Sequence, residues 1–445
     1  MHSPDLWPAP YAHQPVSGSV RVPGSKSLTN RYLALAALAQ GPSLIRHPLV
    51  SRDTNLMRSA LTSLGAQIDG ADSGGAERYG AGGTNGDEIG QTWTLNPPQT
   101  IRAGARIDAG LAGTVMRFVP PIAAFAQGST TFDGDESART MPISALIEAL
   151  RGLGVDIDDG DDPHLPFVVH GTSRVRGGEV GLDASMSSQF VSALLLAGAR
   201  FEDGLTLRHT GERTPSRPHI AMTLQTLAQA GVDASEPEPG LWRVEPGPIR
   251  ALDVEVEPDL SSAAPFLAAA AVTGGSVTIA GWPRRTTQAG NAMPQILAAM
   301  GAGVEFIEGA MSVTGPTRGT LQGIDLDLRD FGELTPVIAA VAALAGTPSR
   351  LRGIEHLRGH ETDRLAGLQC ELTRMGSEVT EHADGLDIAP ATLHAATLET
   401  YHDHRMAMAA AVLGAAVEGV QVVDVATTGK TYPGFERAWS ALVAE

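Results

Sequence analysis

The sequence is almost without lysine. Lys26 and Lys430 are the only two lysines, although lysine and arginine together number 32. A coding bias towards arginine explains most of the other cations, but it does not explain why lysine remains at two positions. A compact ammonium group that can lose a proton is not interchangeable with a guanidinium group. We therefore expect Lys26 and Lys430 to take part in chemistry.

Cysteine and long apolar runs are also scarce. The single Cys370 excludes an intramolecular disulfide and fits a reducing cytosol. Cys370 lies in an amphipathic segment, where we predict a small core residue and not a nucleophile. No apolar run reaches the ~18 residues of a membrane span, and the first residues lack the layout of a signal peptide. These features predict a cytoplasmic protein, which we expect to be a monomer.

Positive charge is in deficit as well. The formal net charge is −18 at pH 7. This charge argues against nucleic acid or an anionic membrane as the main partner. A local basic pocket on such a protein can still bind a small anion.

Small apolar residues are abundant and form a repeat. Six Ala-rich segments each begin with small polar or charged residues and close near a glycine. Their start signals and glycine stops predict helices that are apolar on nearly every side and therefore mostly buried. A strand-like run follows each helix. The six segments span residues 25–41, 112–128, 185–198, 259–274, 332–346 and 403–419.

A second, more amphipathic helix is predicted after five of these segments and runs into another strand. The spacing of roughly 70 to 90 residues exceeds that of solenoid repeats, so each unit is typical of a βαβ-type module. Six modules predict an α/β protein of two domains with three modules each. Residues 236–240 and 254–258 are predicted to mark the boundary, and Gly-rich residues 70–90 a surface loop. The second helices are predicted to end at Gly65, Gly154, Gly231, Gly301 and Gly376.

The starts of the buried helices indicate where ligands bind. If the buried helices of each half run parallel, their N-termini converge on one face. Unpaired N–H groups and the helix dipole favour anions there. Two such faces across a cleft would form an anion trap. Apart from Glu333, the residues at these starts are anion ligands or neutral donors: Lys26–Ser27, Gly113–Thr114, Ser187–Gln189, Ser261–Ser262 and His404–Arg405.

Several of these residues allow two interpretations. Ser187 and Ser188, with Ser216 and Arg217, are typical of a phosphate cradle, although a solvated serine N-cap explains them equally well. Glu333 is either a carboxylate that offsets a helix dipole or a base that faces the cleft.

Two short segments, 360–364 and 402–405, each combine histidine, a carboxylate and arginine. Asp363 and Asp403 are predicted to be ion-pair partners that orient the arginines. We predict no metal at His402 and His404, because no second carboxylate or cysteine cluster has ligand spacing. We also expect no cofactor, since the sequence has neither a P-loop nor a dinucleotide-binding glycine motif after a strand.

With these residues assembled, the chain resembles the enolpyruvyl transferase family, and within it the branch that acts on shikimate 3-phosphate. The motifs occur in the family's order and span almost the whole chain. They are Pro23–Ser27, Ala112–Thr114, Ser187–Phe190, Glu361–Leu365, Asp403–Met408 and Lys430–Pro433.

The resemblance implies a fold and an activity. The fold would be an inside-out α/β barrel of two similar domains, residues 24–257 and residues 1–23 with 258–445. Each domain would hold three βαβαββ units with buried parallel helices, and the active site would lie in the cleft between the domains. The activity would be transfer of the enolpyruvyl group of phosphoenolpyruvate to the 5-hydroxyl of shikimate 3-phosphate, in aromatic amino acid biosynthesis. No cofactor or metal would be required.

The resemblance also implies roles for single residues. Glu333 would be the base and Glu361 the acid, with Lys26, His404 and Lys430 as further catalytic groups. The residues expected to bind shikimate 3-phosphate are Lys26, Ser27, Arg31, Ser187, Ser188, Gln189, Ser216, Glu333 and His360. Those expected to bind phosphoenolpyruvate are Lys26, Gly113, Gln189, Arg364, Arg405 and Lys430.

The chain departs from the family pattern at three places. Leu111 stands where many members have asparagine, and His360 where many have lysine. Met141 stands where the family usually has an arginine that contacts the phosphate of phosphoenolpyruvate. Losing that charge-assisted contact would cost roughly 2–4 kcal/mol of binding, unless Arg139 reaches the site instead.

Two alternatives stay open. One is an enolpyruvyl transferase that acts on UDP-N-acetylglucosamine, although its relatives usually carry a cysteine on a mobile loop. The other is a non-catalytic relative that binds anions, which Met141 favours. Gly113 predicts sensitivity to glyphosate.

Overall fold

The computed structural model describes residues 5–70 and 91–444, so nearly all of the predicted loop of residues 70–90 lies outside the described residues. Within the described chain, residues 24–70 with 91–256 form one compact unit, here called the first unit. Residues 5–23 with 257–444 form the second unit. The chain passes from one unit to the other after Pro23 and after Val256.

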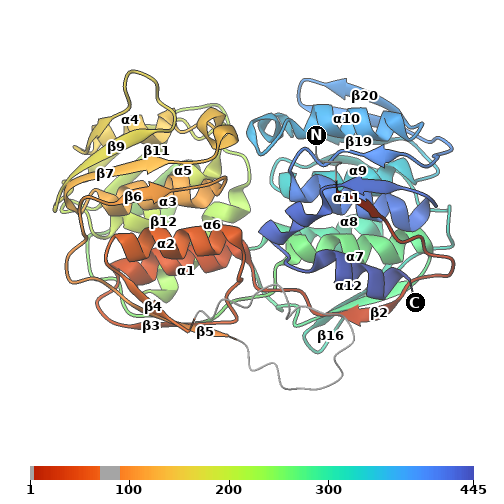
Figure 1. The fold of residues 1–445 in the computed structure, drawn as a ribbon, viewed down its shortest axis with the longest axis horizontal. Helices are drawn as coiled ribbons and strands as arrows, with labels where there is room; N and C mark the ends of the chain where they lie inside the picture. Colours follow the sequence, from red (N-terminus) through yellow and green to blue (C-terminus); the bar gives the residue numbers. More distant parts are fainter. Residues whose placement is uncertain (1–4, 71–90, 445) are drawn as a thin grey trace. The chain divides into compact units, whose positions relative to one another are not determined.

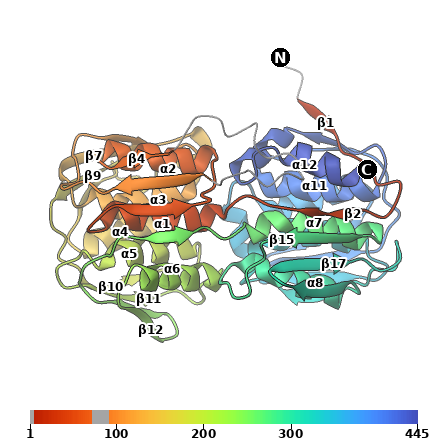
Figure 2. The same cartoon turned by 90° about the horizontal axis from the view of Figure 1, so that it is seen from below.

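Both units are built from a repeated module of strand, helix, strand, helix and a β-hairpin. Five modules give a four-stranded sheet in which the first two strands pair in parallel and the hairpin pairs antiparallel to the second. Each unit takes one strand from a distant part of the sequence. In the first unit β14 (Asp253–Glu255) pairs with β3 (Ser43–Arg46). In the second unit β2 (Ser17–Val20) pairs with β15 (Ser276–Ala280), and Figure 2 shows these two strands side by side.

The first unit contains three complete modules (Figure 1). Their elements, besides β3 and β14, are α1 (Lys26–Leu38), α2 (Arg52–Ser63), β4 (Gln67–Asp69), β5 (Thr92–Asn96), β6 (Arg106–Asp108), α3 (Gly113–Ala123), β7 (Gln127–Asp133), the 3-10 helix η1 (Glu136–Thr140), α4 (Ser144–Gly152), β8 (Asp156–Asp158), β9 (Phe167–Thr172), β10 (Gly178–Leu182), α5 (Ser188–Gly198), β11 (Leu205–His209), α6 (Arg217–Gln229), β12 (Ala234–Glu238) and β13 (Leu241–Val244).

The second unit contains two complete modules and a shortened third. Its elements, besides β2 and β15, are β1 (Leu6–Pro8), α7 (Leu260–Thr273), η2 (Ala289–Ala292), α8 (Met293–Ala299), β16 (Gly303–Ile307), β17 (Ala310–Thr314), β18 (Asp325–Asp327), η3 (Gly332–Leu334), α9 (Thr335–Ala343), β19 (Ser349–Arg352), η4 (Glu355–Gly359), α10 (Arg364–Arg374), β20 (Glu378–His382), β21 (Gly385–Ala389), β22 (Thr397–Leu398), α11 (His404–Ala416), β23 (Gln421–Val423), η5 (Val425–Lys430) and α12 (Phe435–Val443).

The sequence predicts a second helix after only five segments, but the sixth module also contains one, α12, and within the described chain lacks only the hairpin. Here η5 and α12 follow β23, and no hairpin follows among the described residues. Strand β1 from the N-terminal segment completes the three-stranded sheet of this module and pairs antiparallel to β23.

The six predicted apolar helices form the cores of the two units. Helices α1, α3 and α5 pack together in the first unit, and α7, α9 and α11 in the second. All 14 residues of α7 are buried. Alanine side chains allow helices to approach closely, so the helices fill the middle of each unit and the sheets lie around them (Figure 1). The predicted α/β fold with buried helices is confirmed.

Two predictions from the sequence are wrong. Residues 236–240 do not mark a boundary, because they form the end of β12 and the turn into β13. Pro237 is tolerated there since β12 is the edge strand of its sheet. Cys370 is not a core residue but is exposed on α10.

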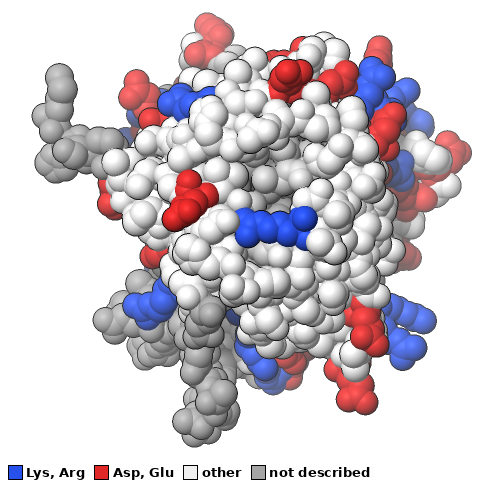
Figure 3. All heavy atoms as spheres, turned by 90° about the vertical axis from the view of Figure 1, so that its right-hand side faces the viewer, with Lys and Arg blue, Asp and Glu red and all other residues white. Residues whose placement is uncertain are grey.

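Charged side chains are unevenly distributed on one face of the protein (Figure 3). On the face drawn in Figure 3, uncharged side chains predominate and most charged ones lie near the edge. Many ion pairs are exposed on both sides, such as Arg352–Asp325, and such pairs contribute about 0–1 kcal/mol. Pairs with little exposure on both sides are therefore the informative ones, and those of Arg364 and Lys430 lie around the starts of α10 and α11. None of the described helices is long and apolar enough to cross a membrane.

Candidate active site

Hydrogen bonds between the buried helices of the first unit show that their N-termini lie together. Asn30 Nδ2 of α1 donates to Thr114 Oγ1 of α3 at 2.7 Å, and Arg31 Nη2 donates to Ser192 Oγ of α5 at 3.2 Å. These residues all lie in the first two turns of their helices. The three helices therefore run parallel, as predicted, and their positive ends form one anion-binding face.

Lys26 is the first residue of α1. Ser25 caps this helix, since its Oγ accepts from Leu28 N. A cation at the positive end of a helix is unfavourable unless an anion offsets it. Asp53 supplies such an anion, with its Oδ2 3.3 Å from Lys26 Nζ and its side chain only 3% exposed. The pair directs the ammonium group of Lys26.

Arg31 is almost fully buried. Its guanidinium group donates to Thr223 Oγ1 at 2.8 Å and to the carbonyl oxygens of Ser27 at 3.0 Å and His219 at 3.0 Å, as well as to Ser192. The side chain is thus fixed by α1, α5 and α6 together. Its hydrogen bond to Ser27, one turn earlier on α1, places the guanidinium group where it can bind an anion at the helix start.

The residues of the predicted phosphate cradle differ in how they are bonded. Ser187 caps α5, where its Oγ accepts from Gln189 N at 3.3 Å, and Ser188 is the buried first residue of that helix. Ser216 precedes α6 with a left-handed backbone (φ 53°) and makes no side-chain capping bond. Non-glycine residues in this conformation cluster at functional sites. The cation of the predicted cradle, Arg217, forms an ion pair with Glu236 at 2.9 Å.

The side chain of Met141 lies at the start of α3. Its Cε would be 3.7 Å from a Cβ atom placed on Gly113. Arg139 does not take the place of the missing arginine in this structure, because its guanidinium group binds both carboxylate oxygens of Asp133 at 3.1 and 3.0 Å.

In the second unit, Arg364 is the centre of a buried network. It is the first residue of α10, and its side chain is 3% exposed. Nε donates to Asp403 Oδ2 at 2.7 Å, Nη2 to Glu361 Oε2 at 3.0 Å, and Nη1 lies 3.3 Å from His360 Nδ1. Although burial opposes its charge, Asp403 and then Glu361 raise the pKa of Arg364, so the guanidinium group is firmly ionised.

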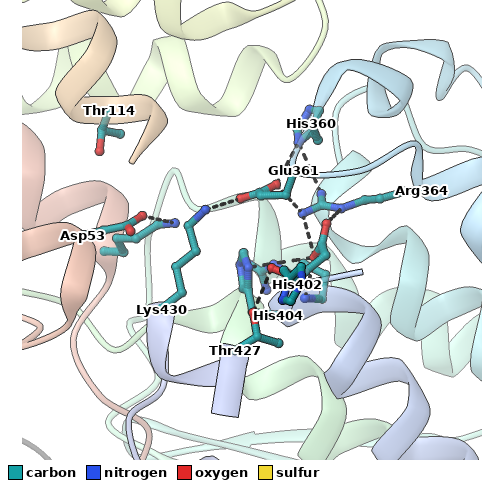
Figure 4. A network of polar contacts seen from close by, with 12 residues as sticks. Asp53, Thr114, His360, Glu361, Arg364, His402, His404, Thr427 and Lys430 are labelled. Atoms are coloured by element: carbon teal, nitrogen blue, oxygen red, sulfur yellow. Dashed lines mark hydrogen bonds and ion pairs between the residues drawn. The ribbon is translucent and has the colours of Figure 1, made fainter. Parts of the chain in front are cut away.

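Lys430 reaches the same carboxylate from the last position of η5. Its Nζ donates to Glu361 Oε1 at 2.6 Å, so Glu361 is held between Lys430 and Arg364 (Figure 4). Burial would raise the pKa of Glu361, but Lys430 and then Arg364 hold it well below its usual range. Glu361 is therefore a carboxylate in this state. A group that is to donate a proton must first lose these two cations.

Asp403 links Arg364 to the start of α11. It is completely buried, and its Oδ1 accepts from Arg405 N at 2.8 Å as the N-cap of this helix. His404 and Arg405 are the first two residues of α11 and are both buried. One backbone cap thus fixes two predicted anion ligands and also orients Arg364. The prediction for Asp403 is confirmed, whereas Asp363 pairs with Arg358 at 2.9 Å and not with Arg364.

Glu333 lies in η3, just before α9. Its Oε1 accepts a hydrogen bond from Ser261 Oγ, which follows the first residue of α7. The starts of α7 and α9 are thereby joined. His356 packs behind this turn, with Nε2 2.6 Å from the position a Cβ atom would take on Gly332.

Sequence reasoning did not identify Asp53, Arg117 and His356. Asp53 resembles an ordinary acidic residue in the first turn of a helix. Arg117 could have been noticed, because a cation within the apolar run Val115–Ala123 is out of character. In the part of the chain that the structure describes, no group of three or more histidine, cysteine or acidic side chains could hold a metal ion.

Six modules with buried parallel helices, and cations gathered at the starts of those helices, define an α/β protein that binds small, multiply charged anions. A family model for EPSP synthase (3-phosphoshikimate 1-carboxyvinyltransferase) matches residues 10–439. The chain belongs to the EPSP synthase family.

Curated relatives agree with the family match. A 3-phosphoshikimate 1-carboxyvinyltransferase from Kocuria rhizophila is 54% identical over 99% of this chain and 97% of that protein. One from Mycobacterium ulcerans is 50% identical over 100% of this chain and 99% of that protein.

Solved structures show the same fold at lower identity. An EPSP synthase from Acinetobacter baumannii superposes with a TM-score of 0.78 at 24% identity, covering 98% of both chains. The enolpyruvyl transferase NikO from Streptomyces tendae gives a TM-score of 0.76 at 18% identity, covering 99% of this chain and 98% of that one.

Proposed function

We propose that the residues at the helix starts of the two units together transfer the enolpyruvyl group of phosphoenolpyruvate to the 5-hydroxyl of shikimate 3-phosphate, which is the activity of the family. One observation carries the assignment of residues. Lys430 and Arg364 hold a carboxylate, that of Glu361, between them. Two cations fixed around one carboxylate are suited to the carboxylate of an incoming substrate.

For phosphoenolpyruvate, Arg364, Arg405 and Lys430 would bind the carboxylate. Its arrival would release Glu361 from Lys430 and Arg364, because both carboxylates compete for the same two cations. Lys26, Gly113 and Gln189 would bind the phosphate. Lys26 suits this role, since it already meets a carboxylate, Asp53, at the positive end of α1.

For shikimate 3-phosphate, Ser187, Ser188 and Ser216 would bind the phosphate through hydroxyl groups at the starts of α5 and α6. Ser27 and Arg31 would bind the carboxylate, with Arg31 held by its own helix. Lys26, Gln189, Glu333 and His360 would complete the site. The hydrogen bond from Ser261 gives Glu333 a fixed direction, which a base needs.

The reaction follows from these positions. A proton adds to the methylene carbon of phosphoenolpyruvate, and the 5-hydroxyl oxygen attacks the adjacent carbon while Glu333 takes its proton. The resulting tetrahedral intermediate loses phosphate and a proton to give the enol ether. Glu361, once released from its cations and protonated from solvent, would donate the first proton. His404, Lys26 and Lys430 would stabilise the negative charge of the substrates and of the departing phosphate.

A phosphate-release assay tests the proposal. The purified protein should release phosphate from phosphoenolpyruvate only when shikimate 3-phosphate is present. Replacing shikimate 3-phosphate by UDP-N-acetylglucosamine should give no release. Release from phosphoenolpyruvate with UDP-N-acetylglucosamine but not with shikimate 3-phosphate would establish the alternative substrate. Binding of shikimate 3-phosphate without turnover would establish a non-catalytic relative.

Inhibition by glyphosate is proposed from the family resemblance at Gly113, where a side chain would collide with Arg117 Nη1. Cytoplasmic localisation and a monomeric state remain predictions from the sequence.

A further inference from the structure

Three side chains surround Gly113, the first residue of α3 in the first unit. A Cβ atom on Gly113 would lie 2.7 Å from Arg117 Nη1, 3.3 Å from Gln189 Oε1 and 3.7 Å from Met141 Cε. The backbone of Gly113, the end of Gln189 and the guanidinium group of Arg117 therefore meet at one point. Arg117 is 3% exposed, packs over the ring of Phe190 and has no role in the proposed chemistry.

Arg117 determines which way the amide of Gln189 faces. Its Nη1 lies 2.9 Å from Gln189 Oε1. A guanidinium group has only donors, so the amide atom next to it must be the oxygen. The NH₂ group of Gln189 consequently points away from Arg117. It makes no hydrogen bond to any other residue that the structure describes.

Arg117 also forms a hydrogen bond with the loop that carries Met141. Its Nη2 donates to the carbonyl oxygen of Pro142, the next residue, at 3.1 Å. The same guanidinium group thus connects α3, the start of α5 and this loop. Because Met141 contributes no charge, the donors at this point depend on how Arg117 arranges its neighbours.

We propose that Arg117 is a positioning residue that makes Gln189 an obligate hydrogen-bond donor and so selects ligands that only accept hydrogen bonds, the oxygens of a phosphate group. The inference rests on the proposed function, in which Gln189 binds substrate phosphate. It adds the reason why a neutral amide acts there as a donor, and it assigns Arg117 a function that its burial alone does not require.

Replacement of Gln189 tests the direction of the amide. In Gln189→Glu, one carboxylate oxygen would stay on Arg117 and the other would face the anion. The melting temperature should be unchanged or higher, while the KM for phosphoenolpyruvate and the Kd for inorganic phosphate rise by about tenfold or more, the value of one charge-assisted hydrogen bond. Equal binding by Gln189→Glu and the parent protein would overturn the proposal.

A double-mutant cycle tests the role of Arg117. Arg117→Met should weaken phosphate binding about tenfold in the parent protein and less than about twofold in the Gln189→Met background, because the amide it orients is then gone. Equal effects in both backgrounds would show that Arg117 acts independently of Gln189. Arg117→Lys, which keeps one donor, should restore part of the affinity.

Arg200→Met is a matched control. Arg200 also donates to a backbone carbonyl, that of Leu38, and packs over Phe125, but it lies at the opposite end of α1. This variant should lose stability and keep phosphate affinity. Phosphate binding is measured without turnover, so a protein that binds phosphate as described but releases none from phosphoenolpyruvate would refute the proposed function and leave this inference standing.

Discussion

At the scale of single residues, the candidate site is a set of cations whose negative partners are already in place. Lys26 has Asp53, Lys430 has Glu361, and Arg364 has both Glu361 and Asp403. Removing one member of a buried pair costs more than the pair contributes, because a charge is left uncompensated. Replacing an anionic partner therefore affects both stability and the direction of the cation, and the two effects must be measured separately.

Asp53→Asn should lower kcat/KM for phosphoenolpyruvate by roughly tenfold or more, because the ammonium group of Lys26 loses the carboxylate that directs it. Steady-state kinetics measure this loss of activity, and a melting curve measures any loss of stability separately. Arg52 lies next to Asp53 on α2 and has an exposed partner, Asp135. Asp135→Asn should change neither kcat/KM nor the melting temperature. Unchanged kinetics for Asp53→Asn would show that Lys26 needs no such partner.

Met141→Arg should lower the KM for phosphoenolpyruvate by about tenfold, since a guanidinium group would enter the space beside Gly113. Arg139→Gln serves as the comparison, because Arg139 is paired with Asp133 and should not affect the KM. A KM that rises in Arg139→Gln would mean that Arg139 leaves Asp133 when substrate binds.

His356 should make the protein sensitive to acid. Burial, with Arg364 and Arg329, lowers its pKa from 6.5 to about 4. The folded state therefore favours neutral histidine. The contribution of His356 to the free energy of unfolding is complete above pH 6.5. It is lost as the pH falls towards 4, by roughly 3 kcal/mol in total. Urea unfolding from pH 7.5 to 4.5 should show a smaller loss for His356→Leu than for the parent protein, and equal losses would contradict the assignment.

At the scale of elements, the sequence reveals the buried helices well and their surroundings less well. Helix α7 is recognisable because Asp259 caps it and Gly274, with a φ of 75°, ends it, and both signals are local. Cys370 was misplaced because only the phase of α10 decides burial. Leu368 and Leu372 face the core, whereas Cys370 is two residues from each and points to the opposite side.

The partners of charged residues were harder to predict. Arg364–Asp403 and Arg117–Gln189 join residues 39 and 72 positions apart, and no pattern in one sequence encodes such contacts. The types of residue at the helix starts could be read from the sequence, but their pairing could not.

Gly332→Ala should reduce activity more than stability. The new Cβ would lie 2.6 Å from Nε2 of the buried His356, so η3 or the imidazole ring must shift, and Glu333 is the next residue. We expect kcat to fall about tenfold or more with a modest change in melting temperature. Gly247→Ala, where a Cβ meets nothing within 4 Å, should be neutral. Equal activity of the two variants would show that the position of η3 is not critical.

At the scale of the whole molecule, one module repeated through the chain produces two units that each gather helix starts at one end. In the first unit these starts carry Lys26, Gly113 and Ser188. In the second unit they carry Glu333 and His404. The family's substrates carry about five negative charges in total, which several such ends and cations would have to balance. Under the proposed function, both units serve one reaction.

Single-turnover phosphate release by Lys26→Met and Lys430→Met tests this central claim most directly, because each variant removes a lysine from a different unit. With saturating phosphoenolpyruvate and shikimate 3-phosphate, the account predicts that both variants fold and that each loses turnover by at least about a hundredfold, the scale of a lost charge at a reacting group. Near-parental phosphate release by either variant would contradict it.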